Sequence, residues 1–425
     1  MAQQPARTST SLRSFLPVVG AGLSFFSGVG LLNSFGVFEV YYKANLLQDK
    51  SESDISWIGS VSMFMLYIIA PLAGVLVDKL GPKLLMCGGT LGLLVAIFMT
   101  SLCTEYYQFF LAQAVLLGVS MSFVTWPAVA VVSRHLPQQR GLALGLAISG
   151  SSLGGLIWPI VLQQLLYHTR LGFGWTIRVV GFVMLPLLAA ACLLVVEAPR
   201  AESGSAAAGR TVDSESGQKQ EQQEMPKANK ADYSIVKKPA FLLLGAGLAI
   251  GYLGLFAPFF YVSAYAVTEG VSSSLSFYLI SIMNAASWFG RVLPGILADR
   301  WGHFNFLIFA MGASATVGFC WTAATNVAGL VVWSVAYGFT SGAVLSLQGA
   351  CAAKIATRET QGTAIGLLTG SVSVTVLVGT PIAGQLIAHG GYLALSMFTG
   401  ATLAAGSLIV GLARGQLGRK VLSVV

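Results

Sequence analysis

One short motif occurs twice in this chain, first as Gly74-Val-Leu-Val-Asp78-Lys79-Leu-Gly81-Pro-Lys83 and again, 221 positions later, as Gly295-Ile-Leu-Ala-Asp299-Arg300-Trp-Gly302-His303. Each copy follows a long apolar segment and precedes another. A second pair of stretches keeps the same offset: Arg140-Gly141-Leu-Ala-Leu-Gly145 and Gln361-Gly362-Thr-Ala-Ile-Gly366. A single short motif carries little information, but two pairs at one offset indicate a tandem duplication of one module.

The composition indicates the environment of this module. Hydrophobic residues make up 55% of the 425 residues and charged residues only 9%, and the mean hydropathy is +0.76. Soluble domains carry about 25% charged residues, so this chain cannot form a surface that water solvates, and the lipid bilayer is its predicted partner. The net charge of +8 comes without a basic stripe interleaved with aromatic residues, which excludes nucleic acid as a partner.

Twelve apolar runs are long enough to cross a bilayer, for which a helix needs about 20 residues. They lie at 15–42, 55–78, 83–103, 107–133, 140–165, 174–196, 239–268, 272–298, 304–324, 326–352, 359–388 and 390–413. The sequence therefore predicts an all-α integral membrane protein with 12 transmembrane helices in two six-helix bundles, 15–196 and 239–413. We predict that 197–238, rich in Ala, Ser, Gln, Glu and Lys, forms a flexible cytoplasmic linker, and that 1–14 and 414–425 are cytoplasmic tails.

The distribution of lysine and arginine orients the helices. With both termini placed in the cytoplasm, 19 of these residues fall on the cytoplasmic side. The four on the outside are Lys43, Lys50, Arg170 and Arg178, and Arg291 lies within a helix. Because cytoplasmic loops carry the excess of basic residues, we predict that both termini are cytoplasmic. Two parallel repeats of this kind are typical of carriers in which one half swings against the other.

Several stretches are more specific than the duplicated motif. They are Asn33-Ser34-Phe35-Gly36-Val37-Phe38-Glu39, Ile55-Ser56-Trp57-Ile58-Gly59-Ser60, the run from Arg140 to Gly155, and Asn284-Ala-Ala-Ser287-Trp288-Phe-Gly290-Arg291. With them the chain resembles the major facilitator superfamily over all twelve helices, and within it the fungal branch of the monocarboxylate-porter-like family. The resemblance implies the major facilitator fold, transport of an organic anion by alternating access, and a multi-pass protein of the plasma membrane.

Two positions depart from the charge pattern of that family. Animal members have an aspartate one turn before the arginine that matches Arg291, and a lysine in the first helix. This chain has Ser287 and Gly36 at the matching positions. Proton coupling by those charges is therefore not expected here, although the resemblance of the scaffold remains.

The duplicated motif supplies the predicted gating residues, which are Asp78, Lys79, Lys83, Asp299 and Arg300. Asp78 and Asp299 each end a helix on the cytoplasmic side and stand beside a basic residue. A carboxylate that faces a helix N-terminus or a neighbouring arginine stabilises that contact. We therefore expect the two carboxylates to latch the bundles in the outward-open state. The alternative is that these charges simply lie at the membrane interface.

Arg291 is the predicted substrate-binding residue. It lies eight residues before Asp299, roughly 12 Å further along the helix, and so toward the middle of the membrane. A charge there costs at least ~2.5–3.5 kcal/mol, so the guanidinium requires a wet cavity or a partner. The one helical acid away from the cytoplasmic end, Glu39, is expected at the outer interface. We infer that a substrate carboxylate supplies the counter-ion through two hydrogen bonds; the alternative is an arginine held by backbone carbonyls and water.

Four further polar residues are candidates for substrate contacts. Asn284 lies two helical turns before Arg291 on the same face, and Asn33, Tyr261 and Gln348 are expected near the cavity. For the amides the alternative is a hydrogen bond between helices, and for Tyr261 it is a lipid-facing position. Glu39 is the candidate for proton coupling at the rim, unless the substrate carries its own proton or transport is facilitated.

The sequence thus predicts a monomeric transporter of a small-to-medium organic anion, with protons as a possible second cargo. The alternatives are an exporter of a secondary metabolite, neutral or bulky, and a membrane sensor that does not transport. No nucleophile–base or metal-ligand spacing lies at one depth, so we expect no enzyme activity, no metal and no cofactor. The direction of transport stays open.

Overall fold

The computed structural model describes residues 15–197 and 234–418, and no strand occurs in these two ranges. The first range contains α1 (Leu16–Leu32), α2 (Phe35–Tyr41), η2 (Tyr42–Leu46), α3 (Glu52–Ile68), α4 (Ala70–Leu80), α5 (Pro82–Thr100), α6 (Tyr106–Phe109), η3 (Phe110–Leu116), α7 (Leu117–His135), α8 (Arg140–Tyr167) and α9 (Gly172–Leu194). The predicted tail 1–14, the linker residues 198–233 and the tail residues 419–425 lie outside the described residues.

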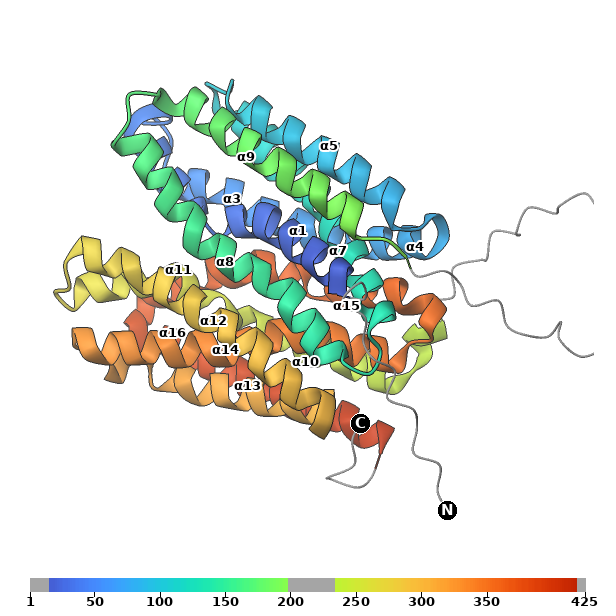
Figure 1. Ribbon diagram of the computed structural model, residues 1–425. Helices are drawn as coiled ribbons and strands as arrows, with labels where there is room; N and C mark the ends of the chain where they lie inside the picture. The colour runs from blue at the N-terminus through green and yellow to red at the C-terminus, as the bar shows by residue number, and fades with distance from the viewer. Residues whose placement is uncertain (1–14, 198–233, 419–425) are drawn as a thin grey trace, which may run out of the picture.

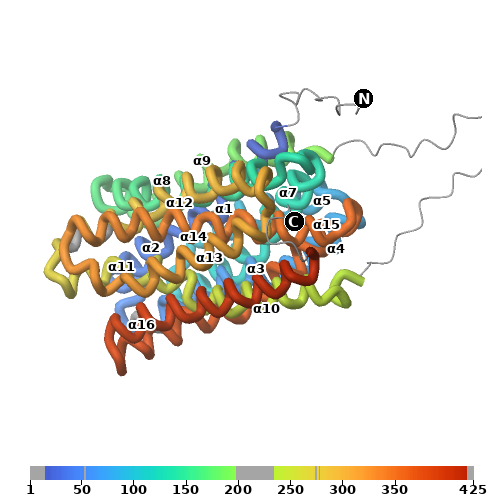
Figure 2. Tube along the Cα trace, turned by 90° about the horizontal axis from the view of Figure 1, so that it is seen from below, coloured from blue at the N-terminus to red at the C-terminus, as the bar shows by residue number. Residues whose placement is uncertain are grey.

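The second range repeats the plan. It contains η4 (Ser234–Lys237), α10 (Pro239–Leu255), α11 (Ala257–Thr268), α12 (Ser273–Trp301), α13 (His303–Phe319), η5 (Trp321–Ala323), α14 (Val327–Ile355), η6 (Arg358–Thr360), α15 (Gln361–Ser371) and α16 (Ser373–Leu417). The last of these contains a break at Gly391, whose φ of 67° is not helical. Figure 2 shows α12, α13, α14 and α16 running side by side along the second half.

Prolines explain two of the breaks within predicted spans. The run 55–78 is divided at Ile69, just before Pro71, and the run 239–268 is divided at Phe256, just before Pro258. Proline has no backbone N–H to donate, so it suits the first turn of a helix and interrupts an existing one. The two short helices in each run therefore follow from the sequence.

Each of the twelve predicted runs is helical over most of its length. Within the described ranges, nine helical segments are long and apolar enough to cross a membrane. The last of them, Arg358–Leu417, covers two predicted runs, whereas α12 and α13 fall outside this set. An all-helical fold is therefore confirmed over the described ranges, and the count of 12 spans stays a prediction.

The helices form two halves, α1–α9 and α10–α16, which lie close together at one end and diverge toward the other (Figure 1). Glycines bring helices of the two halves into contact at the close end. A Cβ added at Gly141 of α8 would overlap the carbonyl oxygen of Gly295 in α12, and one added at Gly74 of α4 would overlap that of Gly362 in α15. These four residues belong to the two repeated pairs, so the duplicated sequence forms the interface between the halves.

The turn after each copy of the motif has the same backbone conformation. Gly81 ends α4 with a φ of 79°, and Gly302 ends α12 with a φ of 98°. Residues with a side chain rarely adopt positive φ, so glycine allows each helix to stop and the next to start at once. The motif thus sets the position of the carboxylate that precedes each turn.

Candidate functional site

Asp78 of the first half binds the start of a helix in the second half. Its carboxylate accepts hydrogen bonds from the backbone N–H groups of Gly362 (3.1 Å) and Thr363 (2.7 Å) and from the Thr363 hydroxyl (2.6 Å). These N–H groups belong to the first turn of α15, where they have no partner within the helix and where the helix dipole favours a negative charge. Arg134 of α7 also donates to this carboxylate.

Asp299 makes the reciprocal contact. It accepts hydrogen bonds from the backbone N–H groups of Gly141 (2.6 Å) and Leu142 (2.9 Å) in the first turn of α8, and His303 Nε2 lies 3.0 Å from one of its oxygens. Each half therefore supplies one carboxylate and one helix N-terminus. We call these two contacts the latch and the end of the molecule that carries them the latch end.

The basic residue that pairs with Asp78 is Arg134, which the motif did not indicate. Arg134 is 8% exposed and also pairs with Glu197, the last described residue of the first half, at 2.6 Å. The predicted gating residues Lys79, Lys83 and Arg300 are exposed, and none of their side chains makes a hydrogen bond or ion pair with another described residue. Both aspartates face helix N-termini, as the sequence analysis described; a gating role for any of the five residues remains a prediction.

Asp78→Asn should weaken the latch and increase the separation of the halves at this end. The substitution removes the ion pair with Arg134 and one of the oxygens that bind N–H groups, and hydrogen bonds to a charged group contribute about 1.5–3 kcal/mol each. The measurement is the distance between spin labels on Lys83→Cys and Arg300→Cys, in a background without the five native cysteines.

The matched control is Asp49→Asn, which removes an exposed carboxylate paired with Lys50. We expect a longer label distance for Asp78→Asn, no change for the control, and little further change when Arg134→Gln is added to Asp78→Asn, since both remove one contact. Additive effects of the two substitutions would contradict a shared contact.

Arg291 lies between the halves, in α12 against α8. It is 4% exposed, and its Nη1 donates to the carbonyl oxygen of Ile148 (2.8 Å) and to the hydroxyl of Ser151. Its Nε has no hydrogen-bond partner. Within the described ranges, no acidic side chain forms an ion pair with Arg291. The guanidinium is thus buried with neutral partners on Nη1 and with an Nε–H that has no partner.

Two of the predicted substrate contacts lie beside Arg291 on the same stretch of α8. Asn33 donates to the carbonyl oxygen of Ser151 (3.3 Å). Asn284 donates to the carbonyl oxygen of Ile280 in its own helix (3.1 Å), and its Oδ1 lies 2.9 Å from where a Cβ at Gly155 would be. Asn33 thus makes the hydrogen bond between helices that the alternative describes, whereas Asn284 bonds within its own helix; both amides lie against one segment of α8, 148–155.

Gln348 is linked to the surroundings of Arg291 by two tyrosines that were not among the predicted site residues. Its Oε1 accepts a hydrogen bond from the hydroxyl of Tyr252 (2.9 Å), whose ring packs against that of Tyr67 with centroids 6.2 Å apart. Both hydroxyls lie close enough to the guanidinium of Arg291 for an electrostatic interaction. A tyrosine within an apolar run gives no sign in the sequence of which side of the helix faces the other half.

Tyr261 lies apart from Arg291 and within electrostatic range of Glu39. Tyr261 donates to the carbonyl oxygen of Thr380 (3.1 Å), and its hydroxyl lies near enough to the Glu39 carboxylate for an electrostatic interaction. Both side chains are half-buried, and they come from different halves. The structure therefore does not bring Tyr261 into contact with Arg291, and it puts Glu39 beside the other half of the protein.

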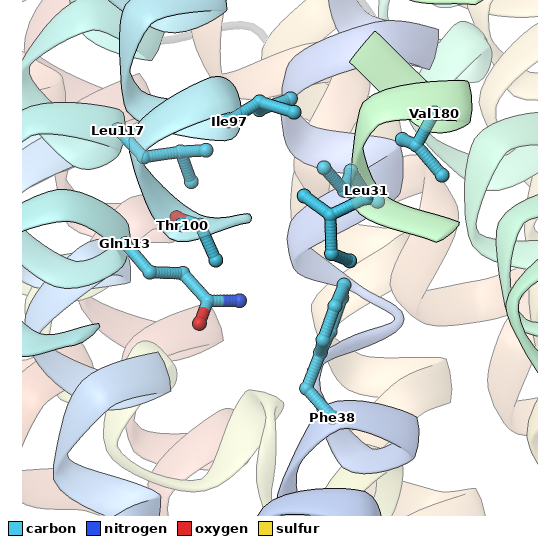
Figure 3. Close-up of a pocket in the computed structure, with 8 residues that line it drawn as sticks. Leu31, Phe38, Ile97, Thr100, Gln113, Leu117 and Val180 are labelled. Carbon is cyan, nitrogen blue, oxygen red and sulfur yellow. The ribbon is translucent and has the colours of Figure 1, made fainter. Parts of the chain in front are cut away.

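A small pocket lies within the first half (Figure 3). Its lining residues are Leu31, Phe38, Ile97, Thr100, Gln113, Leu117, Ile177 and Val180. The cavity volume is about 10 Å³, close to the minimum that one water needs, and Gln113 accepts a hydrogen bond from Tyr42 (2.7 Å). An organic ligand does not fit there, so the group around Arg291 is the better candidate site.

No cluster of three or more potential metal ligands occurs in the part of the chain that the structure describes.

Comparison with known proteins adds the following findings. Residues 20–328 match the model of the Major Facilitator Superfamily. An MFS-type transporter of Aspergillus fumigatus is 54% identical over 98% of this chain and 95% of its own length. The agnestins efflux protein of Paecilomyces divaricatus is 47% identical over 97% of this chain and 89% of its own length. The aspyridones efflux protein of Emericella nidulans is 37% identical over 93% of this chain and 77% of its own length. The fold is similar to that of the fucose:proton symporter of E. coli, with a TM-score of 0.68 at 13% identity over 94% of this chain and 99% of that one.

Proposed function

The chain belongs to the major facilitator superfamily and is a multi-pass membrane transporter, and from this premise we propose that it exports an organic anion by alternating access. In this proposal the latch end faces the cytoplasm, as the distribution of lysine and arginine suggests. The substrate is a small-to-medium, monocarboxylate-like acid, and Arg291 binds its acidic group. The membrane is the plasma membrane, the typical location for this superfamily, and the protein acts as a monomer.

The duplication supports a functional role for Arg291. At the offset of 221 positions its counterpart in the first half is Ala70. A Cβ at Gly145 would overlap the carbonyl oxygen of Arg291, and a Cβ at Gly366 would overlap that of Ala70, so the same helix crossing is built at both positions. Because alanine is sufficient for the crossing in one copy, the arginine in the other is not required for packing. A buried charge that packing does not require is expected to bind a ligand.

The direction of transport is proposed from the relatives. Two of the similar fungal proteins are named as efflux proteins, one for agnestins and one for aspyridones. We therefore prefer export of an acidic secondary metabolite to import. The same names leave a second candidate, the export of a neutral or bulky metabolite, for which Arg291 would not bind the substrate as a counter-ion.

Proton coupling is proposed at Glu39. The carboxylate is half-buried and lies within electrostatic range of Tyr261 in the other half, so its environment changes when the halves move relative to one another. A carboxylate in such a position can bind a proton in one state and release it in the other. The alternatives are a substrate that carries its own proton and facilitated transport.

Counterflow in proteoliposomes tests the anionic substrate. A panel of labelled carboxylic acids is compared with the primary amides of the same acids, which have nearly the same shape and no charge. We expect at least one acid to exchange and its amide to be inert, since a carboxylate accepts two charge-assisted hydrogen bonds from a guanidinium and neutralises its charge, whereas a primary amide has one acceptor oxygen and no charge. An imposed pH gradient in the same vesicles tests coupling.

Equal exchange of an acid and its amide would contradict the anionic substrate and support the export of a neutral metabolite. Exchange of no compound in the panel, acid or amide, by correctly folded protein would contradict the proposed substrate class as a whole. The alternative of a membrane sensor without transport would then be the stronger hypothesis.

A further inference from the structure

Two buried tyrosines meet where the halves face each other. Tyr67 of α3 and Tyr252 of α10 are 6% and 1% exposed, and their rings meet edge to face at 6.2 Å with an angle of 70° between the planes. α3 belongs to the first half and α10 to the second (Figure 1). The contact therefore joins two bodies that must move relative to each other during alternating access.

Each of the two rings is supported from behind by its own half. Tyr67 packs on Trp126 (5.9 Å), whose indole N–H donates to the carbonyl oxygen of Leu66 (3.0 Å). Tyr252 packs on Phe256 (5.6 Å), and its hydroxyl donates to Gln348 (2.9 Å). Both rings thus have a defined position without the other, so their edges and faces stay in place when the halves separate.

Arg291 lies next to this pair. Both hydroxyls lie within electrostatic range of the guanidinium, whose Nε is buried with no hydrogen-bond partner. Separation of the halves breaks the contact between Tyr67 and Tyr252 and leaves two aromatic surfaces beside an unused donor. An aromatic ring restores the ring–ring contacts that are lost, whereas an aliphatic group of equal size does not.

We propose that the substrate is a planar aromatic acid, whose ring binds between Tyr67 and Tyr252 and whose acidic group binds Arg291. The acid is a carboxylate or an ionised phenol or enol on the ring, since all present oxygen acceptors to a guanidinium. This inference rests on the proposed function and adds the class of substrate. The two tyrosines are the residues that determine specificity, and Arg291 is the residue that determines charge.

A matched pair of acids tests the proposal. Radiolabelled 2-naphthoate and decahydro-2-naphthoate have the same charge and carbon skeleton, but only the first is aromatic. Their affinities for the purified full-length protein are measured by equilibrium dialysis. An aromatic contact contributes a factor of about 2 to 12 in affinity, so we expect 2-naphthoate to bind at least about 5-fold more tightly when two rings contribute.

Substitution of the tyrosines tests which residues produce this preference. Tyr67→Leu and Tyr252→Leu each remove one ring and keep an apolar side chain, so each should lower the affinity ratio by about 2- to 12-fold. Tyr67→Phe and Tyr252→Phe keep the ring and should keep the ratio. Tyr107→Leu, which removes an exposed tyrosine of the first half, is the control. If a leucine variant does not fold, the affinity ratios measured for the wild type and for the phenylalanine variants decide whether the aromatic site exists.

The possible outcomes distinguish this inference from the proposed function. If Arg291→Gln prevents binding of both acids but the wild type binds them equally, the aromatic site is wrong and the anionic substrate stands. If the leucine variants keep the wild-type ratio, the two tyrosines do not contact the ring and the proposal is wrong. If neither acid binds the wild type while an aliphatic acid shows counterflow, only the aromatic site is contradicted. If no acid shows counterflow, both the aromatic site and the proposed anionic substrate are contradicted.

Discussion

Arg291→Ala is expected to abolish counterflow of carboxylic acids while the protein remains folded. A hydrogen bond to a charged group contributes about 1.5–3 kcal/mol, so the loss of two bonds from a forked contact lowers affinity by at least about 100-fold. Folding should survive because Ala70 occupies the equivalent crossing in the first half, and because removal of the guanidinium also removes a buried donor without a partner. Initial rates of counterflow and the melting temperature are the two measurements.

Two further variants separate charge from geometry. Arg291→Lys keeps the charge but not the planar fork, so we expect a transport rate about 10-fold or more below that of the wild type. Arg178→Ala is the control: this arginine packs on Trp175 and donates to Ser101, remote from the site. Its counterflow should equal that of the wild type. Full activity of Arg291→Ala would make the arginine structural and remove the main argument for an anionic substrate.

Gly362→Leu is expected to hold the latch end open and to slow counterflow by about 5- to 150-fold. A Cβ at this position would overlap the carboxylate of Asp78 and lie 2.5 Å from Val77 Cγ1 and 2.8 Å from the carbonyl oxygen of Gly74. Overpacking of a tight contact costs about 1–3 kcal/mol, which accounts for the range given. Here the cost falls on the closed state alone, because the neighbours belong to the other half.

The distance between labels on Lys83→Cys and Arg300→Cys checks this mechanism directly. In Gly362→Leu the distance should be longer than in the wild type. Gly411→Leu is the matched control, since nothing outside its own turn of helix lies within 4 Å of a Cβ added at Gly411. A slow variant whose label distance equals that of the wild type would mean that the substitution disturbs folding rather than the latch.

The duplicated sequence predicted the interface between the halves because its glycines and aspartates form it. The offset pair at Gly141 and Gly362 also marked the two helix starts that bind Asp299 and Asp78. In this part of the protein the local sequence predicts the long-range contact, because each copy of the repeat has a helix start and a carboxylate at fixed positions. The subfamily and the count of 12 spans stay predictions.

The partners of the predicted residues could not be derived in the same way. Arg134 looked like any other basic residue near a helix end, and only the tertiary structure brings it to Asp78. Tyr67 and Tyr252 lie in apolar runs in which nearly every position is hydrophobic, so no periodicity shows which side chains face the other half. Tyr261 was grouped with Arg291 by its residue type, but it lies with Glu39.

The turns at Gly81 and Gly302 preserve one backbone conformation in two different sequence contexts, with Pro82 after the first and His303 after the second. In evolutionary terms the chain contains its own homologue, and each half is a reference for the other. Positions at which the halves agree report what the moving scaffold requires. Positions at which the two halves have the same backbone but different side chains, such as Ala70 and Arg291, indicate what the substrate requires.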